Sequence, residues 1–215
     1  MGIDHSRIVA YEGEKYRYAA ETLLYADWRN QSPRPGMHFC APRGALRRVR
    51  ASLAPHHRPL HERPNVILIS RADTKHRKLL NEDAVGAVLD EVSAKHGKTF
   101  QLFIGQSISI KETIDLFKDA SLLFSPHGAG IANAVWMGDG ASVVEMPVHE
   151  THGRDMAHLA KSMGLDYWVT GGVHPFKFLS DFTADLDEIR TMAEHILAAQ
   201  AAGASGMGAA AAPAV

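Results

Sequence analysis

Short apolar runs alternate with stretches of helical periodicity between residues 65 and 170, and this alternation restricts the fold more than any other feature. The run Asn65–Ser70, NVILIS, is rich in β-branched residues and predicts a buried strand. In the next segment, Leu80–His96, apolar residues recur at the i, i+3, i+4 and i+7 positions of one helix face. Strands that alternate with helices are typical of a parallel sheet covered by helices. The sequence therefore predicts an α/β fold.

The same alternation continues to the C-terminal part of the chain. A capping box, Ser109 to Glu112, opens one of the expected helices, because its two end residues can bond each other's backbone N–H groups. Further strands are expected at Thr99–Ile104, Ser121–Ser125, Ala141–Met146 and Leu165–Val169. Further helices are expected after the capping box, from about Ala129, and over Arg154–Met163 and Ala184–Gln200.

The pattern divides the chain into three parts. Residues 1–64 are irregular, apart from a helix expected over Pro42–Leu53. The basic residues Arg43, Arg47 and Arg50 of that helix are interpreted as a solvated face. Residues 65–200 carry the α/β pattern, and residues 201–215, AAGASGMGAAAAPAV, form a low-complexity tail that is expected to be disordered.

Charge and composition argue against several classes of protein. The 215 residues include 23 Lys+Arg and 24 Asp+Glu, a net charge of −1, which gives no case for a nucleic-acid surface. No apolar run approaches the ~20 residues of a membrane span. His57 and His61 have a spacing that metal sites use on a helix, but the surrounding prolines argue against a helix there, so no metal site is expected.

The stretch SPHGAGIANAVWM, Ser125–Met137, places a histidine and two glycines where a strand passes into a helix. Ligands of parallel α/β sheets bind outside the carboxyl ends of the strands, and the first N–H groups of a helix lack internal partners. Gly128, Ala129 and Gly130 have no bulk to keep a phosphate from those N–H groups, and His127 adds a further donor. The alternative is a tight turn with a histidine buried for structural reasons.

Basic residues follow the first strand as well. Arg71 stands at its carboxyl end, in the same crevice as His127 if the two strands are neighbours, and its guanidinium suits bidentate contact with a diphosphate. Arg77 lies in the basic segment that follows, part of which is expected to be solvated loop. Glu145, at the end of the fourth strand, could accept from ribose hydroxyls or form a structural ion pair with Arg71 or Arg77.

Three blocks in series resemble the successive motifs of glycosyltransferase family 61. The family has an I-S-R…R-x-x-x-N-E block, then a P-H-G-A-G-hydrophobic-x-N block, then a V-V-E block. Here they are ISRADTKHRKLLNED (Ile69–Asp83), SPHGAGIANAVWM and ASVVEMP (Ala141–Pro147), in the same order and with the same spacing. The basic segment ALRRVRASL (Ala45–Leu53) is also similar to the helix that precedes the first block in the family.

This resemblance implies a fold and a set of binding residues. The family has a GT-B fold, in which two Rossmann-like domains face each other across a cleft, and the three blocks belong to its C-terminal, donor-binding domain. Residues 1–64 would then be a remnant of the acceptor-side domain with its linker, and 65–200 the Rossmann-like domain that binds the nucleotide-sugar. The residues carried over to the donor site are Arg71, Arg77, Asn81, Glu82, His127, Gly128, Gly130 and Asn133.

The activity that the resemblance implies is the inverting transfer of a sugar of the xylose, N-acetylglucosamine or arabinose class from a UDP-sugar to a glycan or glycoprotein. No cofactor or metal is expected, since no D-x-D pair stands beside a strand end, and no residue is identified as the catalytic base. The resemblance also implies the lumen of the Golgi or endoplasmic reticulum, with no anchor in this chain.

Two alternatives to a glycosyltransferase are considered. A module that binds a nucleotide-sugar without turnover is compatible with the missing acceptor side. An α/β hydrolase is disfavoured, because GQSIS (Gly105–Ser109) fails the last position of G-x-S-x-G, and the HGAG turn follows this segment instead of preceding it.

Overall fold

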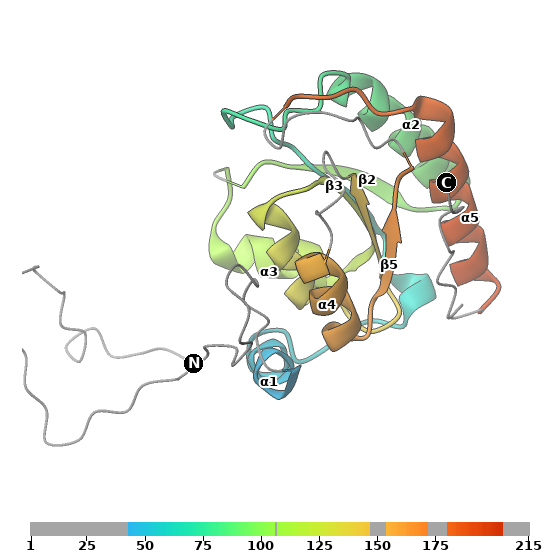
Figure 1. Cartoon of the computed structure of the whole chain (residues 1–215). Coiled ribbons are helices and arrows are strands. Elements are labelled where there is room, and N and C mark those ends of the chain that lie inside the picture. Colours follow the sequence, from blue (N-terminus) through green and yellow to red (C-terminus); the bar gives the residue numbers. More distant parts are fainter. Residues whose placement is uncertain (1–42, 106, 147–153, 172–179, 204–215) are drawn as a thin grey trace, which may run out of the picture. The chain divides into compact units, whose positions relative to one another are not determined.

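The computed structural model describes residues 43–105, 107–146, 154–171 and 180–203 (Figure 1). Its centre is a five-stranded sheet in the order β2-β1-β3-β4-β5, in which all neighbouring strands are parallel. The strands are β1 (Asn65–Ile69), β2 (Thr99–Phe103), β3 (Ala120–Pro126), β4 (Ser142–Met146) and β5 (Asp166–Val169). The predicted α/β fold with a Rossmann-like parallel sheet is confirmed.

Helices cover both faces of this sheet (Figure 1). On one face α2 (Glu82–Lys95) and α5 (Leu186–Ala201) pack on alternate strand residues such as Val66 and Leu122. The other face buries the intervening residues, such as Ile67 and Leu123, against the remaining elements. These are α1 (Arg43–Leu53), α3 (Ile110–Lys118), α4 (Arg154–Met163) and two 3₁₀ helices, η3 (Leu60–Glu62) and η4 (Ala129–Trp136).

The central strand shows why the apolar runs lie inside. All seven residues of β3, ASLLFSP, are buried, because helices cover the strand on both faces. The capping box at the start of α3 is confirmed: the Ser109 N–H donates to Oε2 of Glu112 at 2.8 Å, and the Glu112 N–H donates to Ser109 Oγ at 3.3 Å.

The helix expected from Ala129 is a 3₁₀ helix of eight residues. Asn133 Nδ2 donates to the carbonyl of Gly130 at 3.1 Å, three residues back. A side chain that binds a nearby carbonyl competes with the i to i−4 ladder of an α-helix.

The basic residues of α1 are not a solvated face, so that prediction is wrong for Arg47 and Arg50. Arg50 Nη1 donates to the carbonyls of Met137 and Met163 at 2.7 and 3.0 Å, and Arg47 Nε donates to that of Ser162 at 3.1 Å. These carbonyls end η4 and α4, where helices have acceptors without internal partners. The third basic residue, Arg43, has a side chain outside the described part.

These contacts join the segment before β1 to the rest of the described structure. The segment 43–64 packs on the α/β domain, since Arg63 Nη1 also donates to the Gly138 carbonyl at 2.9 Å. Helix α5 continues to Ala201, one residue into the expected tail, and residues 204–215 lie outside the described part, as do residues 1–42.

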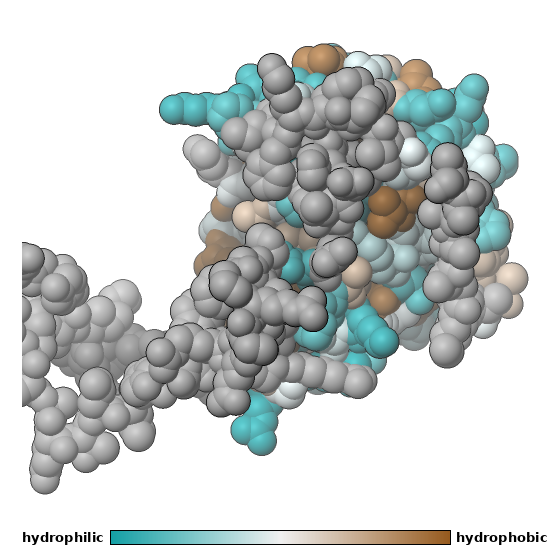
Figure 2. Space-filling view, viewed as in Figure 1, coloured by the Kyte–Doolittle hydropathy of each residue, from teal (hydrophilic) through white to brown (hydrophobic). Residues whose placement is uncertain are grey.

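The surface of the described domain shows no single large apolar face in the view of Figure 2, where apolar residues occur as separate patches. The exposed large apolar side chains belong to several elements, among them Val49 and Leu53 of α1, Leu102 of β2 and Val169 of β5. Among the described helices, none is long and apolar enough to cross a membrane.

Candidate functional site

The loop after β1 and the turn after β3 meet at the carboxyl edge of the sheet. Strand β2, which follows β1 in the sequence, lies on one side of β1, and β3 lies on its other side. The strand order therefore reverses between β1 and β3. Ligands of open α/β sheets bind at such a point. Since β1 and β3 pair directly, Arg71 and the His127 turn emerge side by side, as the sequence predicted for neighbouring strands.

The guanidinium of Arg71 lies against the backbone of Gly128. A Cβ at Gly128 would be 2.2 Å from Arg71 Nη1, so only glycine permits this approach. The backbone of Gly128 is extended, with φ 166°, and other residues could adopt it. Arg71 Nη2 donates to the His76 carbonyl at 3.1 Å, whereas its buried Nε has no partner among the described residues.

Arg77 places a second cation beside the first. Burial lowers the pKa of Arg71, and the charge of Arg77 lowers it further. The pKa of Arg77 is likewise lowered by burial, against an opposing attraction from Glu145. The buried Nε of Arg77 also lacks a partner among the described residues, and neither guanidinium has a salt bridge within them. Two half-buried cations with unused donors are suited to a polyanion.

The backbone of Arg77 is in the left-handed region, with φ 60°. A non-glycine residue pays for this conformation, and such residues cluster at binding sites. The observation is consistent with a side chain that is held in place at some cost to stability.

Replacing Arg77 by glycine and by alanine is expected to separate this cost from the function. Both variants lose the guanidinium, so both should bind inorganic pyrophosphate more weakly. Glycine relieves the positive φ, so Arg77→Gly should be more stable than Arg77→Ala by about 1 kcal/mol. Urea denaturation and calorimetric titration measure the two effects. An alanine variant as stable as the glycine variant would contradict the strain, and unchanged pyrophosphate affinity would contradict the role in binding.

His127, Glu145 and Tyr167 form a chain of hydrogen bonds beside the two arginines. His127 Nδ1 contacts Oε1 of Glu145, and the Tyr167 hydroxyl donates to Oε2 of the same carboxylate. Glu145 is fully buried, and the His127 backbone N–H donates to the Met146 carbonyl at 3.0 Å. Burial, and then the neighbouring Glu145 charge, raises the pKa of Tyr167 well above its ordinary value. Both carboxylate oxygens of Glu145 therefore have protein partners.

Three further candidates bond to the chain itself. Asn81 exchanges two hydrogen bonds with the backbone of Ala184, at 2.9 and 3.0 Å. Glu82 accepts from Ser70 Oγ at 2.7 Å and from the Arg71 N–H at 3.3 Å, so it fixes the end of β1. Asn133 binds Gly130, as described above. Through these contacts, Asn81 and Glu82 stabilise the loop that contains Arg71 and Arg77.

A cavity of ≈ 440 Å³ opens at this edge of the sheet. Arg71, Gly130 and Asn133 are part of its wall, which also contains the carboxylate of Asp73, several hydroxyl groups and apolar side chains. His127 does not line the cavity; it precedes Gly128, on which the Arg71 guanidinium rests. The small residues also matter here, because a Cβ at Gly130 would lie 3.0 Å from Ile69 Cγ2. Ala129 starts η4 between these two glycines.

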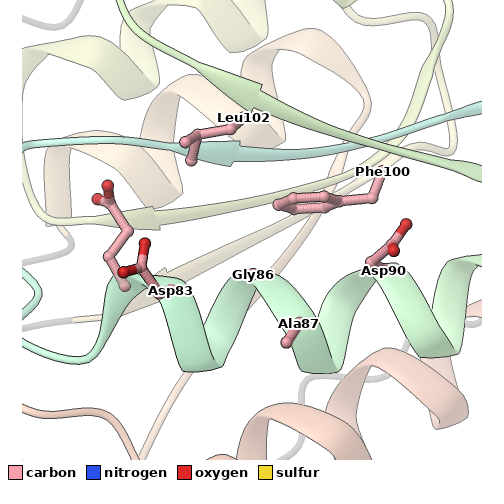
Figure 3. A pocket seen from close by; sticks show the side chains of 7 residues that line it. Asp83, Gly86, Ala87, Asp90, Phe100 and Leu102 are labelled. Atoms are coloured by element: carbon pink, nitrogen blue, oxygen red, sulfur yellow. The ribbon is translucent and has the colours of Figure 1, made fainter.

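A second cavity, of ≈ 350 Å³, lies between α2 and the edge strand β2 (Figure 3). Figure 3 shows Asp83 and Asp90 from the helix at either end of it, with the ring of Phe100 and the side chain of Leu102 opposite. It has carboxylates and no basic side chain in its wall. An anion is therefore expected at the carboxyl edge of the sheet, and not in this cavity.

No metal centre is evident in the described ranges, where no group of three or more His, Cys, Asp and Glu residues could hold an ion. His57, one of the two histidines with metal-like spacing, contacts the Trp136 carbonyl through Nε2 at 2.9 Å.

Tyr167 is the functional candidate that the sequence reading missed. It lies on a strand that the reading expected, two residues before Val169, the register partner of Glu145. On a parallel pair this places Tyr167 and Glu145 on the same face, one step apart along the strands. The register between β4 and β5 was the missing information, and strand propensities do not supply it.

Two proteins of known structure show a limited similarity to this chain. The chain resembles a diflavin flavoprotein A3 from Nostoc sp., with 11% identity over 65% of this chain and 97% of that one, at a TM-score of 0.40. It also resembles a flavodoxin of Streptococcus pneumonia, with 11% identity over 65% and 98% of the two chains and a TM-score of 0.35. No curated protein sequence matches the chain.

The structure defines an α/β protein with a cavity and a pair of arginines at the reversal of its strand order. A sequence model of the family Glycosyltransferase 61 matches residues 8–144, more than half of the chain. The protein belongs to glycosyltransferase family 61. The resemblance noted in the sequence is thereby confirmed, and membership supports a glycosyltransferase activity in general, with a donor and an acceptor as substrates.

Proposed function

We propose that the protein binds the diphosphate of a UDP-sugar at Arg71, Arg77 and the start of η4, and transfers the sugar to a glycan or glycoprotein with inversion. The observation that carries the proposal is the pair of half-buried guanidinium groups whose Nε atoms have no partner among the described residues. Family membership supplies the reaction class. The donor sugar would be of the xylose, N-acetylglucosamine or arabinose class, by resemblance.

The site suits a diphosphate for three physical reasons. Two cations side by side repel each other, and an anion between them removes that repulsion. The first N–H groups of η4 carry partial positive charge, and the small residue Gly128 at this end lets the Arg71 guanidinium lie next to them. The Arg71 guanidinium is already held against Gly128, so little side-chain entropy is lost on binding.

The proposed chemistry is direct displacement at the anomeric carbon. The acceptor hydroxyl forms the new bond, the bond to the diphosphate breaks, and UDP leaves with the bonding electron pair. Negative charge grows on the leaving diphosphate, so donors that are already aimed at it lower the barrier. His127, beside Gly128, would add a donor to the arginines. No metal is needed for this charge balance in the proposal.

The acceptor side would come from a second domain of a GT-B arrangement, of which residues 1–64 would hold a remnant. The proposed reaction also needs a base that takes the proton of the acceptor hydroxyl, and no residue is assigned to this role. The lumen of the Golgi or endoplasmic reticulum is the proposed compartment, by analogy with the family.

A ligand panel tests the proposed donor class. UDP at 100 times its dissociation constant should stabilise the folded chain by about 2.7 kcal/mol and raise its melting temperature accordingly. NAD should not, since no G-x-G-x-x-G follows a strand. A melting temperature that no uridine nucleotide changes would contradict the proposal. UDP binding without sugar transfer to any acceptor would instead identify a nucleotide-sugar-binding module.

A further inference from the structure

We propose that Tyr167 is a positioning residue for His127, which it controls through the buried carboxylate of Glu145 without contacting the ligand. The inference rests on the proposed function, since it assigns His127 to the diphosphate. The geometry is a line of three side chains from three segments: Tyr167 on β5, Glu145 on β4 and His127 in the turn after β3.

The first step is the charge of Glu145. Its side chain is 0% exposed, and a buried carboxylate is stable only when hydrogen-bond donors and positive charge surround it. The Tyr167 hydroxyl supplies one donor, because its raised pKa keeps the proton on the phenol oxygen. The guanidinium of Arg77, in the loop after β1, attracts the same carboxylate. These two groups favour the carboxylate form of Glu145, and because Tyr167 bonds to Oε2, Oε1 is the oxygen that faces His127.

The second step is the proton of His127. An ionised carboxylate can only accept, so the Nδ1 atom that contacts Oε1 carries a hydrogen. The turn itself is fixed by the bond from the His127 N–H to the Met146 carbonyl. Nε2 is then the ring nitrogen whose protonation changes with the charge of the ring. In the proposed function, Nε2 is the ring nitrogen that would meet the diphosphate, beside the cations of Arg71 and Arg77.

The third step is the effect of losing the Tyr167 hydroxyl. A buried carboxylate that loses a donor is harder to keep ionised, and once protonated it can donate to Nδ1. The hydrogen bond would then reverse, and His127 would be neutral with its hydrogen on Nε2. Tyr167 thus acts across the sheet, although it does not line the cavity at the carboxyl edge.

Nitrogen-15 NMR of the histidine rings tests the inference without any ligand. The spectrum of His127, assigned by comparison with His127→Gln, should show a hydrogen on Nδ1 in the parent chain near neutral pH. In Tyr167→Phe the Nδ1 hydrogen should be lost from a large fraction of the molecules. A parent chain whose His127 has a bare Nδ1 would overturn the inference, and this measurement does not depend on the folding of the variant.

A double-mutant cycle tests the link to the ligand. Tyr167→Phe should weaken the binding of inorganic pyrophosphate about fivefold to tenfold in the parent background. In the His127→Ala background it should have no further effect, because the residue through which it acts is absent. Equal fold-losses in both backgrounds would show a general structural effect and overturn the inference. A parent chain that binds no pyrophosphate and no UDP would contradict the proposed function, and the NMR result would still decide on Tyr167.

Discussion

Glu145→Ala is expected to lower the free energy of unfolding by about 3–5 kcal/mol, a large part of the stability of a domain of this size. The carboxylate is 0% exposed and its two oxygens contact His127 and Tyr167. Removing one partner of a buried polar set leaves the others without compensation, in a place that water does not reach. Urea denaturation followed by circular dichroism measures the loss.

Two control variants make this result specific. Glu145→Gln keeps the size of the side chain and one acceptor oxygen, so it should destabilise the chain less than alanine does. Glu91 is an exposed carboxylate of α2 that pairs with Arg190 at 2.7 Å, and exposed ion pairs contribute little. Glu91→Ala should therefore change stability only slightly. A Glu145→Ala chain as stable as Glu91→Ala would show that the buried contacts do not stabilise the fold.

The same residue shows how far sequence reading reaches. An apolar run that ends in a carboxylate, ASVVE, predicts a buried strand with an acidic residue at its carboxyl end, and β4 agrees with this. Whether that carboxylate would meet a ribose or a cation stayed open. In the structure its oxygens contact His127, in the turn after β3, and Tyr167 of β5, and the pairing of three strands decides this.

The basic residues also show which contacts the sequence can and cannot predict. The sequence could place Arg71 at the carboxyl end of β1, because the strand pattern sets that end. It could not place Arg50, whose partners Met137 and Met163 are 87 and 113 residues away. Local periodicity shows which residues share a helix face, while the acceptors that this face meets depend on how distant helix ends pack.

The candidate site was predictable where a general rule of the fold applies. Parallel sheets gather their ligands at the carboxyl edge, so the position of Arg71 beside the His127 turn could be inferred from the order of elements. The bonds of Asn81 to Ala184 could not, because they join a loop to a segment 103 residues away. A motif residue can therefore support a site through the loop that it fixes.

Arg71→Ala is expected to reduce the affinity for UDP about tenfold to a hundredfold, the range for hydrogen bonds between charged groups. Arg71 is the arginine that lines the cavity, and its buried Nε has no partner among the described residues, so its donors are available to a ligand. Because the side chain is half-buried and makes one hydrogen bond through Nη2, to His76, the variant should still fold. Calorimetric titration with UDP gives the change in affinity.

Gly128→Ala tests the same contact while leaving Arg71 in place. The extended backbone of Gly128 accepts alanine without strain, but the new Cβ would lie 2.2 Å from Arg71 Nη1 and displace the guanidinium. Part of the affinity lost in Arg71→Ala should therefore be lost here, with little change in stability. Gly86→Ala is the matched control, because its Cβ would make an ordinary contact of 3.5 Å with Phe100 of β2 and leave Arg71 untouched. If Gly128→Ala and Gly86→Ala bound UDP as tightly as the parent chain, the close approach of Arg71 to Gly128 would have no part in binding, and the diphosphate would have to lie elsewhere.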